Sequence, residues 1–332
     1  MSEQKGHRIR HVFVLALIIL NTLILVGCAN NTTPPPRPAG TITEFPLPTN
    51  GIPEGITAGP DGNLWFTEKV GNQIGRITPQ GSITQFPLPT PNSFPEGITA
   101  GPDGNLWFTE LSGSIGRITP QGKVTEFVLS TPNSFPGAIT AGPDGNLWFT
   151  DSETGSIGRI TPQGSITQFP LLTTPTQVAG IAAGPGGAIW FTDSATGNIG
   201  HMMPEGAVKE FPLPAPSRFP EGITAGPDGN LWFTEFSGDQ IGRMTTQGSI
   251  TEFPLPTQKR GVMGITRGPD SAVWFTEFTG NQIGRITAQG TITEFPLPTS
   301  DNAPKGITAG PGGTIWFTES TGNQIGRFTP GK

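Results

Sequence analysis

Acidic side chains recur at regular intervals along this chain of 332 residues, each at the end of an apolar phrase of the type WFT(E/D). The seven acids are Glu68, Glu110, Asp151, Asp193, Glu235, Glu277 and Glu319. A second set stands eleven residues ahead of the tryptophan in three copies of this phrase and consists of Glu54, Glu96 and Glu221. The other four copies carry Gly137, Ala179, Met263 and Lys305 at that position. Carboxylates that crowd together raise one another's pKa or recruit a cation, so a divalent ion or a cationic ligand is one chemistry these residues could serve.

An alternative interpretation gives these acids only a structural role. Each could solvate a turn or pair with an arginine that recurs in six copies. The arginines are Arg76, Arg117, Arg159, Arg243, Arg285 and Arg327. Structural ion pairs and functional sites produce the same sequence pattern, so the sequence leaves both interpretations open.

The elements that must position these side chains are visible in the repeat. All seven tryptophans of the chain lie in the WFT phrase, spaced 41 or 42 residues apart. One unit, residues 97–136, contains four stretches of alternating pattern bounded by Gly or Pro: GITAG, NLWFTE, SIGRIT and KVTEFVL. Four short strands at this period are typical of a β-propeller blade. The sequence therefore predicts an all-β fold, a seven-bladed β-propeller with four strands per blade.

The two ends of the repeat predict how the ring closes. An additional segment, Thr41–Leu47, precedes the first unit and matches the fourth strand of the others, whereas the last unit ends without a fourth strand. We expect this segment to join the last blade and remove the open edge. Gly101-Pro102-Asp103-Gly104 predicts a tight turn between the first two strands; a calcium loop would need more oxygen ligands.

The alternation of strand directions places both acidic sets on one face. If the first strand of a unit runs down to this turn, the loop after the second strand and the loop before the first strand both lie at the upper rim. We therefore expect a ligand-binding or metal-binding rim there. Its predicted members are Glu54, Glu68, Glu96, Glu110, Glu221, Glu235 and Glu277.

The first 40 residues read as a targeting segment. Lys5, Arg8 and Arg10 precede an apolar run that ends in Leu25-Val26-Gly27-Cys28, which resembles the lipobox of bacterial lipoproteins. We expect a signal peptide over residues 1–27, a lipidated Cys28 and a Pro-rich tether over 28–40, with the propeller over 41–332. The other possibility is an uncleaved segment with a free thiol. The lipobox predicts an extracytoplasmic protein of the bacterial cell envelope, anchored to the membrane only through lipid.

The net charge and the cysteine content limit which binding partners and which covalent cross-links are possible. Removing residues 1–27 takes away three basic residues and one acidic residue, so the formal net charge of −6 becomes −8. Such a charge makes nucleic acid an unfavourable partner. Because Cys28 is the only cysteine, no disulfide can form within the chain. We expect a monomer that binds a small molecule or a surface partner.

The repeat resembles that of a known family. The unit GITAGPDGNLWFTE…GNQIGRITPQGSITEFPLPT is similar to the repeat of the virginiamycin B lyase family, and the likeness covers residues 41–332. The resemblance implies a seven-bladed propeller and a magnesium-dependent elimination that opens the ring of type B streptogramins. It also implies a histidine base just before the first strand of the last blade, oriented by a glutamate at the end of that blade's second strand. Metal ligands would include a histidine before the first strand of the sixth blade and a glutamate two residues ahead of the base.

This chain keeps little of that catalytic set. Lys305 stands at the base position, Met263 and Ala303 at the two metal positions, and only Glu319 is retained. A lysine acts as a base when burial lowers its pKa, whereas a neighbouring Glu319 would favour the ammonium form, and a thioether is too soft for magnesium. The mature chain's single histidine, His201, occupies the slot of the recurring arginine, so we expect it to pack rather than to catalyse.

Three functions follow from these observations. The first is binding of a ligand, cation or partner at the acidic rim without chemistry. The second is a magnesium-dependent C–O lyase or a related lactone-opening enzyme, with Glu319 and Lys305 as the candidate catalytic residues. The third is a purely architectural surface protein.

Overall fold

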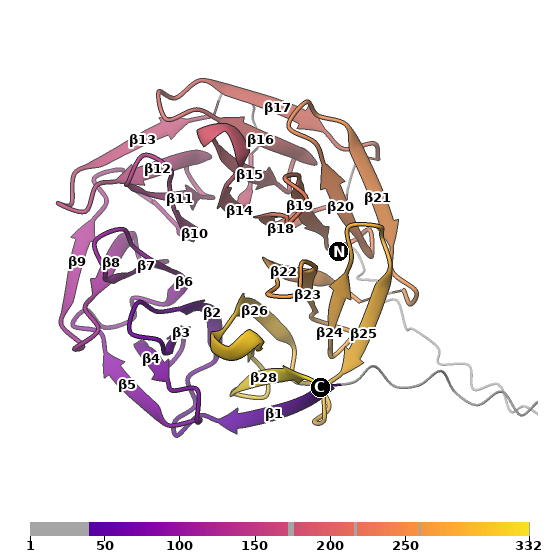
Figure 1. Cartoon of the computed structure of the whole chain (residues 1–332). Coiled ribbons are helices and arrows are strands. Elements are labelled where there is room, and N and C mark those ends of the chain that lie inside the picture. Colours follow the sequence, from indigo (N-terminus) through magenta and orange to yellow (C-terminus); the bar gives the residue numbers. More distant parts are fainter. Residues whose placement is uncertain (1–39, 172–175, 216–217, 259, 332) are drawn as a thin grey trace, which may run out of the picture. The chain divides into compact units, whose positions relative to one another are not determined.

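A ring of small β-sheets is formed by the residues that the computed structural model describes, which are 40–171, 176–215, 218–258 and 260–331. They form seven antiparallel sheets of four strands each, together with two short 3-10 turns, Pro185–Gly187 and Pro311–Gly313. Figure 1 shows the sheets arranged around a central axis, with one edge strand of each sheet facing the axis. The predicted seven-bladed propeller is confirmed.

Each blade consists of four adjacent strands, which follow one another from the central axis to the outside of the ring. The innermost strands are β2 (Pro53–Ala58), β6 (Pro95–Ala100), β10 (Pro136–Ala141), β14 (Val178–Ala183), β18 (Pro220–Ala225), β22 (Val262–Arg267) and β26 (Pro304–Ala309). The second strands are β3 (Leu64–Glu68), β7 (Leu106–Glu110), β11 (Leu147–Asp151), β15 (Ile189–Asp193), β19 (Leu231–Glu235), β23 (Val273–Glu277) and β27 (Ile315–Glu319). The third strands are β4 (Gln73–Ile77), β8 (Ser114–Ile118), β12 (Ser156–Ile160), β16 (Asn198–Met202), β20 (Gln240–Met244), β24 (Gln282–Ile286) and β28 (Gln324–Pro330). The outermost strands are β1 (Gly40–Pro46), β5 (Ile83–Pro87), β9 (Val124–Val128), β13 (Ile166–Pro170), β17 (Val208–Pro212), β21 (Ile250–Pro254) and β25 (Ile292–Pro296).

The ring closes as the sequence predicts. Blades 1 to 6 each consist of consecutive strands, starting with β2–β5, whereas blade 7 combines β26–β28 with β1. Strand β1 lies antiparallel to β28, with Ile42 opposite Phe328 and Phe45 opposite Ile325. Figure 1 shows the two ends of the described chain meeting in this blade. Blade 7 therefore has four strands like the other six blades.

The tryptophan phrase fills the space between blades. Trp65 is fully buried and packs with Leu106 and Phe108 of blade 2, whereas Leu64 and Phe66 pack toward blade 7. The indole also donates a hydrogen bond of 3.0 Å to Asp61 in the turn before β3. Burying an aromatic side chain of this size removes roughly 150–250 Å² from water, so the same phrase is needed at every gap.

The recurring arginines serve this packing and not the acidic rim. The Arg76 guanidinium lies 5.5 Å from the ring centroids of both Trp65 and Phe86, a cation–π geometry. It also donates to the carbonyl oxygen of Pro120 in the next blade, at 3.2 Å. Four of these arginines pair with the aspartate of the turn before the second strand, as Arg117 does with Asp103 at 3.9 Å. The interpretation that they neutralise the rim acids is therefore wrong.

His201 takes the place of this arginine in blade 4. Its ring meets Trp190 edge-on, with the centroids 4.5 Å apart. Burial and the nearby Lys209 lower the pKa of His201, which favours the neutral imidazole at neutral pH. The residue packs, as the sequence predicts.

The predicted signal peptide, Cys28 and most of the tether lie outside the described residues. Among the residues that are described, no helix is long and apolar enough to cross a bilayer.

Candidate functional site

A β-bulge at the start of each innermost strand positions the site. In blade 1, Pro53 lies opposite Glu68 and Ile56 lies opposite Phe66, so β2 contains one more residue than β3 over this interval. The same shift occurs in all seven blades. A bulge re-aims the side chain that it carries. Here it brings the second residue of every innermost strand to the wall of one central pocket of about 380 Å³.

A ring of threonine hydroxyls fixes these bulges. The Gly55 N–H donates to Thr67 Oγ1 at 2.9 Å, and the Thr67 hydroxyl donates to the Glu96 carbonyl of the next blade at 2.7 Å. The pattern continues around the propeller until Thr318 donates to the Glu54 carbonyl at 2.7 Å. At Gly55 a Cβ atom would lie 2.6 Å from the Glu96 carbonyl oxygen, so a side chain there would force the two blades apart; in blade 3, where Ala138 takes this position, the bridge from Thr150 to the Ala179 carbonyl is longer, at 3.1 Å. These hydrogen bonds therefore join the residues of the pocket wall to the second strand of their own blade and to the neighbouring blade.

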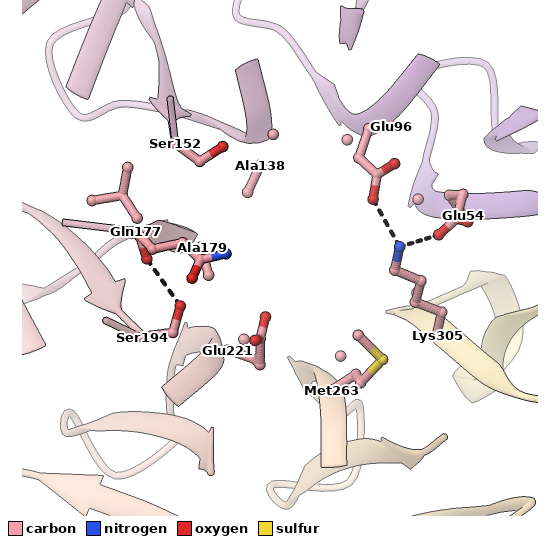
Figure 2. A pocket seen from close by; sticks show the side chains of 18 residues that line it. Glu54, Glu96, Ala138, Ser152, Gln177, Ala179, Ser194, Glu221, Met263 and Lys305 are labelled. Carbon is pink, nitrogen blue, oxygen red and sulfur yellow. Dashed lines mark hydrogen bonds and ion pairs between the residues drawn. The ribbon is translucent and has the colours of Figure 1, made fainter. Parts of the chain in front are cut away.

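Four charged side chains form a network on one side of the pocket. Lys305 of blade 7 forms ion pairs with Glu54 of blade 1 and with Glu96 of blade 2, the latter at 2.7 Å. Lys69 approaches Glu96 from β3's end, at 2.8 Å. Figure 2 shows Lys305 extended between the two carboxylates. Burial by itself would lower the pKa of Lys305, but Glu96 and Glu54 raise it above its usual range; for Glu96, Lys305 and Lys69 outweigh burial and lower the pKa.

Glu221 of β18 stands apart from this network. The residue is half-buried in the same pocket, and its carboxyl group makes no hydrogen bond or ion pair with the described residues, although its backbone carbonyl accepts from the Thr192 hydroxyl. Burial raises the pKa of Glu221 to about 7, against a smaller opposing effect of Lys305. The carboxyl group therefore titrates near neutral pH and can accept a proton or a cation there.

The predicted set of rim carboxylates separates into two groups. Glu54, Glu96 and Glu221 line the pocket. The acids that end the second strands are fully buried inside their blades: Glu68, Glu110, Asp151, Asp193, Glu235, Glu277 and Glu319. Glu68, for example, accepts hydrogen bonds from Gln73 and Gln85, each at 2.9 Å. They contribute to the blades, and none of them lines the pocket.

The two predicted catalytic residues do not meet. Glu319 accepts hydrogen bonds from Gln324, at 2.8 Å, and from Asn302, and it lies outside the pocket lining. The carboxylates beside Lys305 are Glu54 and Glu96. Lys305 is therefore held as an ammonium ion by neighbours that the sequence places in other blades.

Several residues of the site were missed from the sequence: Lys69, which reaches the site through its ion pair with Glu96, and three residues that line the pocket, Ser152, Ser194 and Gln177. Lys69, Ser152 and Ser194 directly follow the buried acid of a second strand, and Gln177 directly precedes β14. The Ser194 hydroxyl donates to the Gln177 carbonyl at 2.9 Å, and both residues line the pocket with Ser152 (Figure 2). Side chains along a strand alternate between the two faces of the sheet, and of the seven residues that follow a buried acid only Ser152 and Ser194 line the pocket, so the repeat carries no signal that singles them out.

Magnesium, which the family resemblance implies, does not fit the residues present. Met263 offers a thioether, which is a poor ligand for magnesium, and Ala303 offers no side-chain ligand. Glu54 and Glu96 converge, but the Lys305 ammonium occupies the position between them. Within the described ranges, no three His, Cys, Asp or Glu side chains are grouped to hold a metal ion.

Among solved structures, the chain is similar in sequence and in fold to virginiamycin B and streptogramin B lyases. Virginiamycin B lyase from Staphylococcus aureus is 40% identical, with a TM-score of 0.84 over 87% of this chain and 99% of that one. A streptogramin B lyase is 38% identical, with a TM-score of 0.85 over 88% of this chain and 98% of that one. A catalytically inactive histidine-to-alanine variant of the S. aureus enzyme, solved with quinupristin, is 39% identical, with a TM-score of 0.84 over 87% of this chain and 99% of that one.

Sequence comparison gives the same family. No protein in the curated set matches the chain significantly. The sequence profile described as the virginiamycin B lyase family matches residues 36–178 and 131–332, which together span the propeller. The chain belongs to the virginiamycin B lyase family.

Proposed function

We propose that this protein is an extracytoplasmic lipoprotein whose propeller binds a cationic small molecule in the central pocket, without lyase chemistry. The observation that carries the proposal is Glu221, a half-buried carboxyl group in the pocket with no partner among the described residues. A cationic ligand would stabilise its ionised form.

The charges of the pocket support a cationic ligand. Lys305 and Lys69 balance Glu54 and Glu96 one for one. Glu221, when ionised, is then the uncompensated charge of this group. A pocket of about 380 Å³ falls within the range of small-molecule sites, which combine apolar walls with a few polar groups.

Exposed aromatic residues support a ligand with an apolar part. Phe94, Phe135 and Phe219 are 40%, 40% and 42% exposed. Each stands two residues ahead of the bulge residue of its blade, the position that lines the pocket. Phe94 and Phe219 have positive φ values of 52° and 50°, a conformation uncommon for bulky side chains and often found at functional sites.

The second candidate is the family's reaction, a C–O lyase or a lactone-opening enzyme. Its support is the identity of 38–40% to solved lyases. The ammonium of Lys305 cannot take up a proton, and Glu319 lies outside the pocket lining. In this candidate Glu221, which titrates near neutral pH, would be the proton acceptor.

Quinupristin distinguishes the two candidates. We expect calorimetric titration to show binding that weakens at least about tenfold in Glu221→Gln, and chromatography with mass spectrometry to recover quinupristin unchanged, with or without Mg²⁺. A product of equal mass and altered retention would establish the lyase candidate instead. Absence of binding by the folded protein would reject the proposed ligand class.

The anchor proposal rests on the lipobox-like sequence ending in Cys28. Expressed in a bacterial host, the full chain should incorporate an alkyne-labelled fatty acid and sediment with membranes. Cys28→Ala should lose the label and leave the membrane fraction. Labelling that persists in Cys28→Ala would contradict this assignment.

A further inference from the structure

The cation at the centre of the charged network is part of the chain itself. Glu54 and Glu96 come from adjacent blades, and their carboxylates converge on a single point, the Lys305 Nζ atom. Glu54 is 7% exposed, so few water molecules can screen its side of this contact. Two carboxylates that meet in this way in a buried setting require a positive charge between them.

A divalent ion would need the same space. Mg²⁺ binds carboxylate oxygens at about 2.0–2.1 Å and Ca²⁺ at roughly 2.3–2.6 Å, so either ion would have to displace the ammonium group. Lys69, at 2.8 Å from Glu96, adds a second positive charge that repels an incoming metal. Burying the displaced ammonium without a partner would be costly.

The remaining walls of the pocket do not offer a second place for a metal. Met263 presents a thioether, and Ala138 and Ala179 present methyl groups. Glu221 is a single carboxylate separated from the network. Where one carboxylate holds Mg²⁺ in proteins, substrate phosphates usually supply further ligands, so Glu221 alone makes a weak site.

We infer that Lys305 is a built-in cation that occupies the place of a divalent metal between Glu54 and Glu96, so that the pocket works without metal, and that neutralising Lys305 uncovers a divalent-cation site. This inference goes beyond the binding function proposed above and does not depend on it, because it concerns metal alone. An ammonium has three N–H donors. Two are used by the carboxylates, which leaves one for a ligand oxygen.

Mn²⁺ binding tests the inference. Lys305→Met keeps the length of the side chain and removes its charge. Measured by electron paramagnetic resonance and by calorimetry, this variant should bind one Mn²⁺ per chain with an affinity at least about tenfold higher than any that the wild type shows for the ion. Adding Glu54→Gln and Glu96→Gln to Lys305→Met should abolish the gain. Lys209→Met is the matched control, because that lysine lies over Phe211 on the outer strand β17, and it should behave as the wild type.

Two results would overturn the inference. One is a folded Lys305→Met that gains no Mn²⁺ site. The other is wild-type protein that already binds Mn²⁺ in the pocket, shown by a thermal stabilisation that disappears in Glu54→Gln/Glu96→Gln. The second measurement does not require Lys305→Met to fold.

Discussion

At the residue scale, the buried acids of the second strands make stability depend on pH. Burial, reinforced by Glu44, raises the pKa of Glu319 to about 8, although Gln324 donates to it. The ordinary value is 4.5, so between these pH values the folded protein binds more protons than the unfolded chain. A group with a raised folded-state pKa contributes stability that is complete below its unfolded pKa and is lost as pH rises through the folded value. Glu277, also raised to about 8, acts in the same direction.

We predict that Glu319→Gln weakens this dependence. The unfolding free energy of the wild type should fall between pH 5 and pH 8.5. In the variant this fall should be smaller by on the order of 1 kcal/mol, because the amide carries no charge to bury. Urea unfolding at the two pH values measures the difference. Glu153→Gln, at an exposed position, serves as the control and should leave the pH dependence unchanged. A wild-type protein that is more stable at pH 8.5 than at pH 5 would contradict the assignment.

Contacts between individual side chains of the site were the hardest feature to predict from the sequence. Glu54, Glu96 and Glu221 could be predicted at the channel because they share one position of the repeat. The pairing of Lys305 with two of them could not, because it joins residues 251 positions apart that become neighbours only through ring closure. The family resemblance implied that Glu319 lies beside Lys305, but the bulge brings Lys305 to the pocket wall while Glu319 stays buried inside the blade.

At the element scale, the bulge and the threonine form one unit. The bulge frees a backbone N–H and a carbonyl from the ladder, and buried backbone groups of this kind need partners. One hydroxyl supplies both, and the carbonyl that it satisfies belongs to the next blade. The strands themselves follow from the alternating pattern. The bulge could not be predicted in this way, because a shift of the strand pairing by one residue leaves no mark in the sequence of the strand.

Thr234→Val tests this unit. The substitution removes the hydroxyl that accepts from Gly222 N–H at 2.9 Å and donates to the Met263 carbonyl at 2.7 Å. Leaving buried polar groups without partners costs about 1–3 kcal/mol, which urea unfolding should show. Thr251→Val, at an exposed position of the outer strand β21, is the matched control and should change stability by less than about 0.5 kcal/mol. Equal effects of the two substitutions would show that the hydroxyl bridge does not contribute.

At the scale of the whole propeller, the sequence predicted the closure correctly because the evidence for it is simple counting: one surplus strand at the beginning and one missing at the end. Closure also completes the site, since Lys305 of blade 7 must lie beside Glu54 of blade 1. The aromatic stack of blade 7 likewise needs the first strand, because Phe45 lies over Trp316 with the ring centroids 5.7 Å apart.

Removing β1 should therefore weaken the entire ring and not only its edge. A chain that begins at Leu47 lacks the partner of β28 and leaves Trp316 without Phe45. Its melting temperature should fall on the order of 10 °C below that of a chain beginning at Gly40, and the exposed edge of β28 should promote self-association, measured by scanning calorimetry and light scattering. A synthetic peptide of residues 40–47 added to the shortened chain should restore part of the loss, because it can pair with β28 in trans. If both chains melt at the same temperature, β1 does not hold the ring closed, and the geometry around Lys305 must depend on contacts between blades 7 and 1 alone.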